Sequence, residues 1–173
     1  GHAAVIRLLL EAGADFQAVD HHGKTPFYRA VEYGHARAVR LLLEAGADPD
    51  CFGGLVRSGL RPLLQAVHKG HAEVATVLLE AGADPHGAGG RSPLFAAVRG
   101  GDVDFVRLLL EAGADAGTSR SYTGQTPLSW AAVHGRAGVA EILLEAGADV
   151  NAATPLGFTC LHEAVEAGHA EVA

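Results

Sequence analysis

Histidine is the residue type in this chain that most invites a chemical role, because ten histidines occur among 173 residues. A neutral imidazole can bind a metal ion, and it can carry a proton near neutral pH. His68 and His71 have the i, i+3 spacing of a ligand pair, but Gly70 separates them onto different predicted helices. His21 and His22 adjoin at a predicted turn, with no cysteine or acidic partner at ligand spacing. The histidines therefore predict no metal site.

The residues that could catalyse a reaction are equally scattered. Ser129 and His134 are five positions apart, which points them to different sides of a helix, and no glycine-flanked nucleophile turn is present. The glycines between Gly87 and Gly90 could approach a phosphate, but a short connector explains them as well. The chain is therefore predicted to be non-catalytic and to need no cofactor.

The regular spacing of five aspartates shows how the chain is organised. The segment Leu-Leu-Glu-Ala-Gly-Ala-Asp recurs every 31 to 36 residues, ending at Asp15, Asp48, Asp84, Asp115 and Asp149. These aspartates are thus a repeated turn residue and not an acid/base pair. Self-similarity at such a period is typical of repeat proteins, in which each repeat is one small structural unit that packs on its neighbours.

Each repeat contains two predicted helices. In the second repeat, Thr25-Pro26 provides an N-cap hydroxyl and a proline at the first helical position. Phe27, Ala30 and Val31 then form an apolar stripe of helical period, and Gly34 ends this first helix after barely two turns. A second helix is predicted from about 35 to 45, and Gly46 ends it in a left-handed conformation. Helices this short need stacked neighbours to be stable.

These segments resemble the ankyrin repeat, which pairs a β-turn with two antiparallel helices over ~33 residues. The resemblance rests on Thr126-Pro127-Leu128, on Ala131-Ala132, on Gly34-His35 and on the Leu-Leu-Glu-Ala-Gly-Ala-Asp segment. It implies an all-α solenoid of stacked helix-turn-helix pairs with β-turn or hairpin connectors. The expected domain is single and spans 1–173, with a partial repeat 1–15, repeats at about 16–48, 49–84, 85–115 and 116–149, and a partial repeat 150–173.

Departures from the family pattern are informative. Arg61 stands where the helix-capping threonine is expected, which predicts a poorly capped helix. Cys160 replaces the proline of the Thr-Pro-Leu motif. In the family, a histidine after that motif ties neighbouring turns together, and here it survives only as His162. Four other residues take its place, which implies softer coupling between turns: Tyr28, Leu64, Phe95 and Ser129.

Composition limits the class of protein. The formal net charge of −7 argues against non-specific nucleic-acid binding by the chain as a whole. Two cysteines at unrelated repeat positions give no disulfide framework and favour a reducing, intracellular setting, cytoplasmic or nuclear. No apolar run reaches the ~18 residues of a membrane span. The chain lacks methionine and starts inside a repeat, so we expect it to be a piece of a longer protein.

The connectors and first helices carry an unequal distribution of charge. Between residues 20 and 125 this inner side has eight basic residues against three acidic ones, Asp20, Glu32 and Asp50, and the last repeat reverses the sign with Glu163 and Glu166. Chance scatter is the alternative explanation. Aromatic side chains at the same positions could anchor an interface. The predicted partner-binding residues are His21, His22, Lys24, Arg29, Tyr33, Phe52, Arg57, Leu60, His68, Lys69, Arg91, Arg99, Tyr122, Gln125, Trp130, His134 and Phe158.

The sequence thus predicts a module that binds a protein or peptide on the concave side of the stack, and the bound part of the partner is expected to be acidic. The connector from Pro49 to Leu60 is the longest, and its apolar residues suggest a recognition element. Two alternatives stay open: a substrate-recognition fragment of a larger enzyme or adaptor complex, and a polyanion or nucleic-acid binder that uses the basic inner side.

Overall fold

The computed structural model describes residues 2–52, 60–88, 90–118 and 123–168, and the regular structure in these ranges is helical. Two isolated antiparallel bridges, Ala88 to Arg91 and Ala153 to Thr159, close connectors between helices. None of the helices in these ranges is long and apolar enough to cross a bilayer. The chain divides into two compact units, Gly1–Asp84 and Pro85–Ala173. The prediction of one domain that continues across residue 84 stays a prediction.

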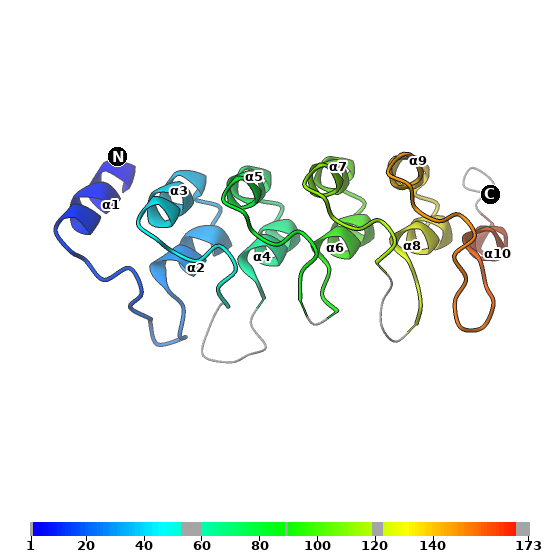
Figure 1. Cartoon of the computed structure of the whole chain (residues 1–173), viewed down its shortest axis with the longest axis horizontal. Coiled ribbons are helices and arrows are strands. Elements are labelled where there is room, and N and C mark those ends of the chain that lie inside the picture. The colour runs from blue at the N-terminus through cyan, green and yellow to red at the C-terminus, as the bar shows by residue number, and fades with distance from the viewer. Residues whose placement is uncertain (1, 53–59, 89, 119–122, 169–173) are drawn as a thin grey trace. The chain divides into compact units, whose positions relative to one another are not determined.

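Helices alternate between two layers in each unit. The first unit contains α1 (His2–Glu11), α2 (Pro26–Glu32), α3 (Ala36–Glu44), α4 (Pro62–Lys69) and α5 (Ala72–Glu80). Here α2 and α4 are the inner helices, and α1, α3 and α5 are the outer ones (Figure 1). Each inner helix packs on the outer helix that follows it, and helices of one layer pack side by side. The connector between α1 and α2 projects beyond the inner helices, away from the outer layer (Figure 1).

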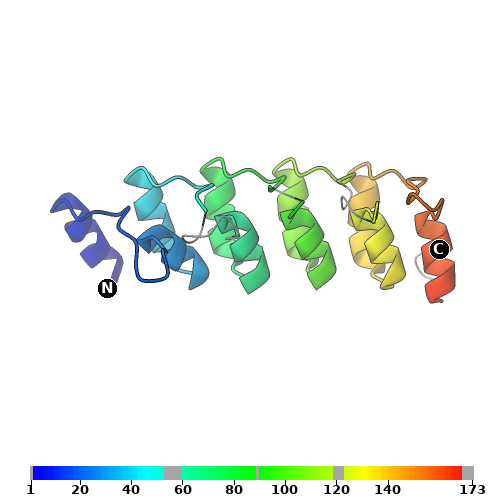
Figure 2. The same ribbon diagram turned by 90° about the horizontal axis from the view of Figure 1, so that it is seen from below.

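The second unit repeats this arrangement. It contains α6 (Pro93–Gly100), α7 (Val103–Glu111), α8 (Pro127–Val133), α9 (Ala137–Glu145) and α10 (Cys160–Ala167). The inner helices α6, α8 and α10 pack in sequence order, and α7 packs beside α9. Seen from below, the helices of each unit lie side by side (Figure 2). In both units we call the connectors together with the inner helices the inner face.

Capping hydroxyls start the inner helices where the sequence predicts them. The side chains of Thr25, Ser92 and Thr126 accept hydrogen bonds from backbone N–H groups three residues later. Such a cap is worth ~1 kcal/mol, because it satisfies a donor that has no partner inside the helix. Arg61 makes no side-chain cap at the start of α4, so the prediction for that helix is confirmed. At Thr159 the cap involves His162, whose Nδ1 lies 2.8 Å from Thr159 Oγ1.

The end of each Leu-Leu-Glu-Ala-Gly-Ala-Asp segment is a Schellman-type helix end. At the end of α3, Gly46 has φ +99°, its N–H donates to the Leu43 carbonyl, and the Ala47 N–H donates to the Leu42 carbonyl. A residue with a Cβ would be strained at this φ, which explains the glycine. The aspartate that follows accepts a hydrogen bond from the backbone N–H two residues on, as Asp48 does from Asp50 at 2.9 Å. The predicted turn role of these aspartates is confirmed.

The core of each unit comes from the predicted apolar stripes. In the first unit Phe27, Val31 and Val39 have almost no exposed surface, and in the second unit Leu94 and Leu109 are equally buried. Fully burying side chains of this size contributes ~1.5–3 kcal/mol each, so the stacked leucines and valines are the main source of stability.

Neighbouring repeats are also joined through the glycine between their helices. In the first unit the ring of His71 lies against Gly34, so that a Cβ there would be 2.8 Å from His71 Nδ1, and His71 Nε2 lies 3.1 Å from the Glu32 carbonyl oxygen. In the second unit Arg136 occupies the same place against Gly101, and its Nη2 donates to the Arg99 carbonyl at 3.1 Å. In both cases a long polar side chain satisfies a carbonyl near the end of the preceding inner helix.

Candidate partner-binding surface

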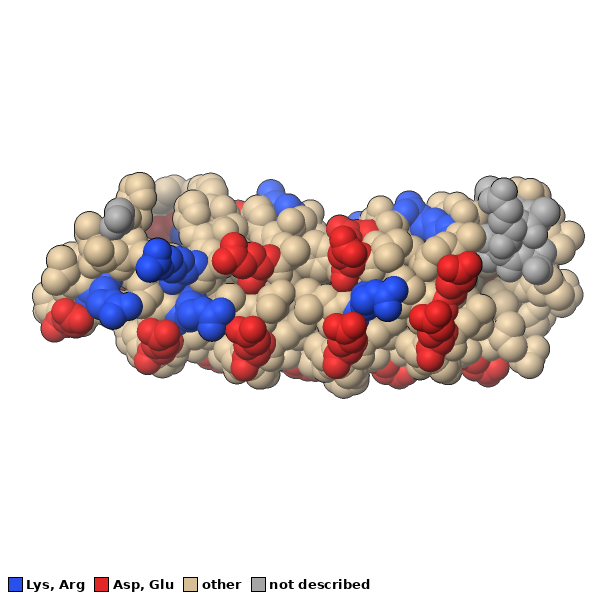
Figure 3. Space-filling model, turned by 90° about the horizontal axis from the view of Figure 1, so that it is seen from above, with Lys and Arg blue, Asp and Glu red and all other residues tan. Residues whose placement is uncertain are grey.

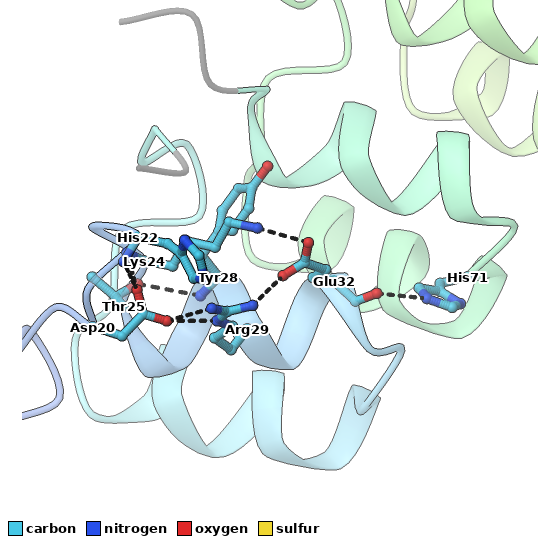
Figure 4. Close-up of polar contacts among 8 residues, drawn as sticks. All are labelled: Asp20, His22, Lys24, Thr25, Tyr28, Arg29, Glu32 and His71. Atoms are coloured by element: carbon cyan, nitrogen blue, oxygen red, sulfur yellow. Dashed lines mark hydrogen bonds and ion pairs between the residues drawn. The ribbon is translucent and has the colours of Figure 1, made fainter. Parts of the chain in front are cut away.

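A network of charged side chains organises the inner face around α2 (Figure 4). Asp20 accepts hydrogen bonds from the backbone N–H groups of His22, at 2.8 Å, and Lys24, at 3.0 Å. Arg29 Nε donates to the second oxygen of Asp20 at 2.7 Å. The Lys24 N–H, together with the Arg29 guanidinium, holds the pKa of the Asp20 carboxyl well below its usual range. The turn is therefore fixed to the helix that follows it.

Glu32 extends this network along α2. It accepts from Lys24 Nζ at 2.7 Å and from Arg29 Nη1 at 3.1 Å, and the pKa of its carboxyl is lowered, chiefly by the hydrogen bond from Lys24. Lys24 and Arg29 thus form ion pairs with acidic residues of their own repeat. This pairing reduces the positive character that the sequence assigns to this part of the inner face.

Tyr28 and Cys51 lie beneath the network. Tyr28 is buried, with Lys24 Nζ 5.7 Å from its ring centroid, and burial followed by the charge of Glu32 raises its pKa to about 12. Cys51 is half-buried, and burial followed by the charges of Asp48 and Asp50 raises the pKa of its thiol to about 11. Both groups stay protonated at neutral pH and serve as packing and not as nucleophiles.

Tyr33 lies exposed at the end of α2, with 61% of its surface accessible and its ring centroid 6.2 Å from that of His35. It borders a groove of about 310 Å³ that is lined mainly by apolar side chains of α1, α2 and α3, among them Leu9 and Ala30. An exposed aromatic ring at the end of an inner helix suits an interface anchor.

Arg61 ties together the start and the end of its own repeat, 49–84, in the first unit. Its Nη1 lies 3.4 Å from Asp50 Oδ1 and 3.0 Å from Asp84 Oδ2, while the Asp84 N–H donates to Asp50 at 3.2 Å. Its guanidinium carbon is 5.8 Å from the ring centroid of Phe52, which is exposed. Arg61 therefore fixes the start and the end of the long connector in place of the missing helix cap. Residues 53–59 of that connector, including Arg57, lie outside the described residues.

Trp130 is only half exposed, because it packs within the inner layer of the second unit. Its ring centroid is 5.6 Å from that of Phe95 on α6 and 4.2 Å from that of His134, which stacks on it. His134 Nδ1 lies 2.9 Å from the Trp130 carbonyl oxygen. Trp130 thus has a packing role in addition to the predicted contact with a partner.

A second groove opens between two connectors of the second unit and has a volume of about 410 Å³. Thr123 and Gln125 line it from one connector, and Pro155, Leu156 and Phe158 line it from the next. Glu163 reaches it from α10, and its Oε2 is buried without a hydrogen-bond partner in the described part of the chain.

None of the predicted partner-binding residues that the structure describes is buried. Lys69 and Arg99 are exposed on α4 and α6, and neither makes an ion pair with a described residue. Tyr122, like Arg57, lies outside the described residues. The remaining residues of the set are exposed or half-exposed on their own unit: His21, His22, Leu60, His68, Arg91 and Gln125.

The predicted partner-binding residues did not include Asp20, Glu32, Arg61 or Glu163, although the first two and Glu163 were counted among the acidic residues of the inner side. The signal for Glu32 was its position three residues after Arg29, at ion-pair spacing. Glu163 occupies the repeat position of Trp130 and Arg29, so the same argument from position would have included it.

Ser129 and His134 are each hydrogen-bonded to a backbone carbonyl and not to one another. Ser129 is buried and its Oγ donates to the Thr126 carbonyl at 3.2 Å, whereas His134 is exposed. Across residues 2–52, 60–88, 90–118 and 123–168, no three His, Cys, Asp or Glu side chains gather closely enough to hold a metal ion. What the surface provides is a set of fixed polar groups and exposed aromatic rings.

Charges on the outer layer are of mixed sign. The face seen in Figure 3 looks onto the outer helices and shows acidic and basic side chains interspersed. Arg40 pairs with Glu80 of the next outer helix at 3.1 Å, and not with Glu44, which lies four residues after it on α3. Both partners are more than half exposed, so this pair contributes under ~1 kcal/mol.

Comparisons with known proteins agree with this architecture. A family model described as ankyrin repeats in three copies matches residues 1–52, 63–154 and 118–173, and one described as ankyrin repeats in many copies matches 29–79. The solved structure of the ankyrin repeat domain of Bcl-3, a member of the IkappaB protein family, is similar with a TM-score of 0.83 and 33% sequence identity. That match covers 93% of this chain and 72% of the other. No curated protein sequence matches.

Proposed function

Because this chain belongs to the ankyrin-repeat family, we propose that it is a non-catalytic module that binds a partner protein or peptide through its inner face. The observation that carries the proposal is the fixed turn around α2, where Asp20, Arg29 and Glu32 hold one another and Tyr33 stays exposed. Groups that are fixed before binding lose little conformational entropy when a partner docks, so more of the contact energy appears as affinity.

The expected charge of the partner follows from which basic side chains of the inner face are not already paired with acidic residues. Lys24, Arg29 and Arg61 are paired with acids of their own unit, whereas Lys69 and Arg99 are not. We therefore assign attraction of an acidic segment chiefly to Lys69 and Arg99. Exposed charges of this kind mostly raise the association rate, and salt screens them.

The test is affinity capture with the intact chain, followed by mass spectrometry of the retained proteins. Tyr33→Ala is the inner-face variant, because the exposed ring can be removed without opening the core. Leu144→Ala is the matched control, since Leu144 is an exposed hydrophobic residue on the outer helix α9. We expect Tyr33→Ala to lose the captured partner and Leu144→Ala to keep it. Equal capture by both variants would refute the inner face as the binding surface.

Trp130→Ala is a less direct test. The substitution removes packing against Phe95 as well as exposed ring surface, so it should lower stability by ~1–3 kcal/mol. A loss of binding by this variant counts only when a urea titration shows that it is folded under the assay conditions.

A further inference from the structure

The groove between the last two connectors differs from the rest of the inner face in the sign of its charge. On α10 the acidic residues are Glu163 and Glu166, and the helix contains no lysine or arginine. Among the described residues no basic side chain pairs with Glu163. Glu163 is half-buried, and its Oε2 has no hydrogen-bond partner among the described residues, so the chain leaves the charge of this carboxylate unbalanced and favours a cationic group in the groove.

Nearby polar groups of the chain are engaged elsewhere. His162, the residue before Glu163, is bonded to Thr159 at 2.8 Å. Thr123 Oγ1 lies within hydrogen-bond distance of Gln125 Oε1, at 3.4 Å. The groove thus presents Glu163 as an acceptor and offers it no cation from the described residues.

The apolar side of the groove is held in place before any ligand arrives. Leu156 is 84% exposed at the tip of a turn that Thr154 and Phe158 close, with the Thr154 N–H donating to the Phe158 carbonyl at 2.8 Å. The Phe158 N–H donates in return to Thr154 Oγ1 at 3.2 Å. Together with Pro155 and Phe158, which are also exposed, Leu156 gives the groove an apolar side of the kind found at contact surfaces.

We propose that this groove binds a peptide segment in which a lysine or arginine adjoins an aliphatic residue. The cationic group pairs with the carboxylate of Glu163, and the aliphatic side chain packs against Leu156 and Phe158. Glu166, one helical turn further along α10, is exposed and does not line the groove. This inference rests on the proposed function and specifies the chemistry of the partner at one end of the inner face.

The experiment selects peptides from a phage-displayed random dodecamer library on the immobilised full chain. Glu163→Gln keeps the size of the side chain and removes its charge, and Glu166→Gln is the matched control on the same helix. We expect the selected peptides to carry Lys or Arg beside Leu, Ile or Val. Their affinity, measured by fluorescence anisotropy, should fall at least tenfold on Glu163→Gln and less than twofold on Glu166→Gln.

Selected peptides without basic residues, or peptides that bind Glu163→Gln as tightly as the unsubstituted chain, would overturn the inference. So would a selection that yields no peptide dependent on Glu163. Circular dichroism confirms that each variant is folded. The proposed function is judged separately by the Tyr33→Ala capture. A partner retained by the intact chain and equally by Glu163→Gln removes this groove from the interface and leaves the module function standing.

Discussion

Some ionisable side chains of the inner face have pKa values that depend on the fold. Asp20 is the clearest case, because backbone N–H groups and Arg29 stabilise its ionised form. In the unfolded chain an aspartate titrates near its usual pKa of about 3.9. Since the folded pKa lies below this value, the unfolded chain takes up the proton first as the pH falls. The stabilisation is therefore complete above about pH 4 and is lost progressively below it.

Asp20→Asn should accordingly lower stability at neutral pH by an amount that shrinks as the pH falls below about 4. Urea unfolding at a series of pH values measures this difference. Asp104→Asn is the control, because Asp104 is exposed and has no hydrogen bond or ion pair in the described part of the chain. A difference between Asp20→Asn and the unsubstituted chain that stays constant down to pH ~2 would contradict the assignment.

The thiol of Cys51 should react slowly although it is half exposed. A pKa of about 11 instead of 9.0 lowers the thiolate fraction near neutral pH about 100-fold. We expect alkylation by iodoacetamide at about pH 8 to be at least tenfold slower in the folded chain than in urea, followed at the Cys51 peptide by mass spectrometry. Equal rates in the two states would show that neither burial nor Asp48 and Asp50 protect the thiol.

At the scale of helices and connectors, the ion pairs of Arg61 and of Arg40 in the first unit should differ in their contribution to stability. Arg61 binds Asp50 and Asp84 with about a quarter of its side chain exposed, whereas Arg40 binds Glu80 in the open. We expect Arg61→Ala to lower the free energy of unfolding by ~1–3 kcal/mol, because hydrogen bonds between charged groups are lost in a half-buried place. Arg40→Ala should cost less than ~1 kcal/mol. Urea titration compares them, and equal losses would contradict the anchoring role of Arg61.

The long connector from Pro49 to Leu60 is predicted to be a recognition element. Shortening it to the length of the 16–24 connector, while keeping Asp50 and Arg61, should leave the thermal midpoint nearly unchanged and weaken partner binding. The reason is that Arg61 joins the two ends independently of the residues between them. Calorimetry and the capture assay measure the two effects. A shortened chain that melts far earlier would show that the connector belongs to the core.

Helices and caps could be predicted from the sequence because their causes are local. Thr25-Pro26 and Gly46 set the ends of α2 and α3 through hydrogen bonds within a few residues. The candidate surface was harder to predict, because charge counting ignores pairing. Lys24 looked available until the structure placed it against Glu32, eight residues away. Whether Glu163 has a hydrogen-bond partner depends on the residues that the fold places around it, and no local sequence pattern shows which residues these are.

On the scale of the whole molecule, the chain carries a net negative charge and yet offers unpaired basic side chains on its inner face. Arg99→Glu should slow association with an acidic partner severalfold at low ionic strength, and the effect should fade as salt is added. Arg37→Glu, on the exposed side of α3, is the control. Stopped-flow association rates at several salt concentrations provide the measurement. Equal rates for the two variants would leave the basic residues without a role in binding.

In two repeats, the side chain that follows the glycine between the two helices hydrogen-bonds to a backbone carbonyl of the preceding repeat. His71 reaches the Glu32 carbonyl, and Arg136 reaches the Arg99 carbonyl, each lying against a glycine of the preceding repeat. A repeat of this chain is therefore not an interchangeable copy. A gene duplication or deletion that brings a short side chain into this position would leave an unpaired carbonyl at the new junction. Over evolutionary time such arrays should gain and lose repeats most easily where a glycine and its long neighbour are inherited together.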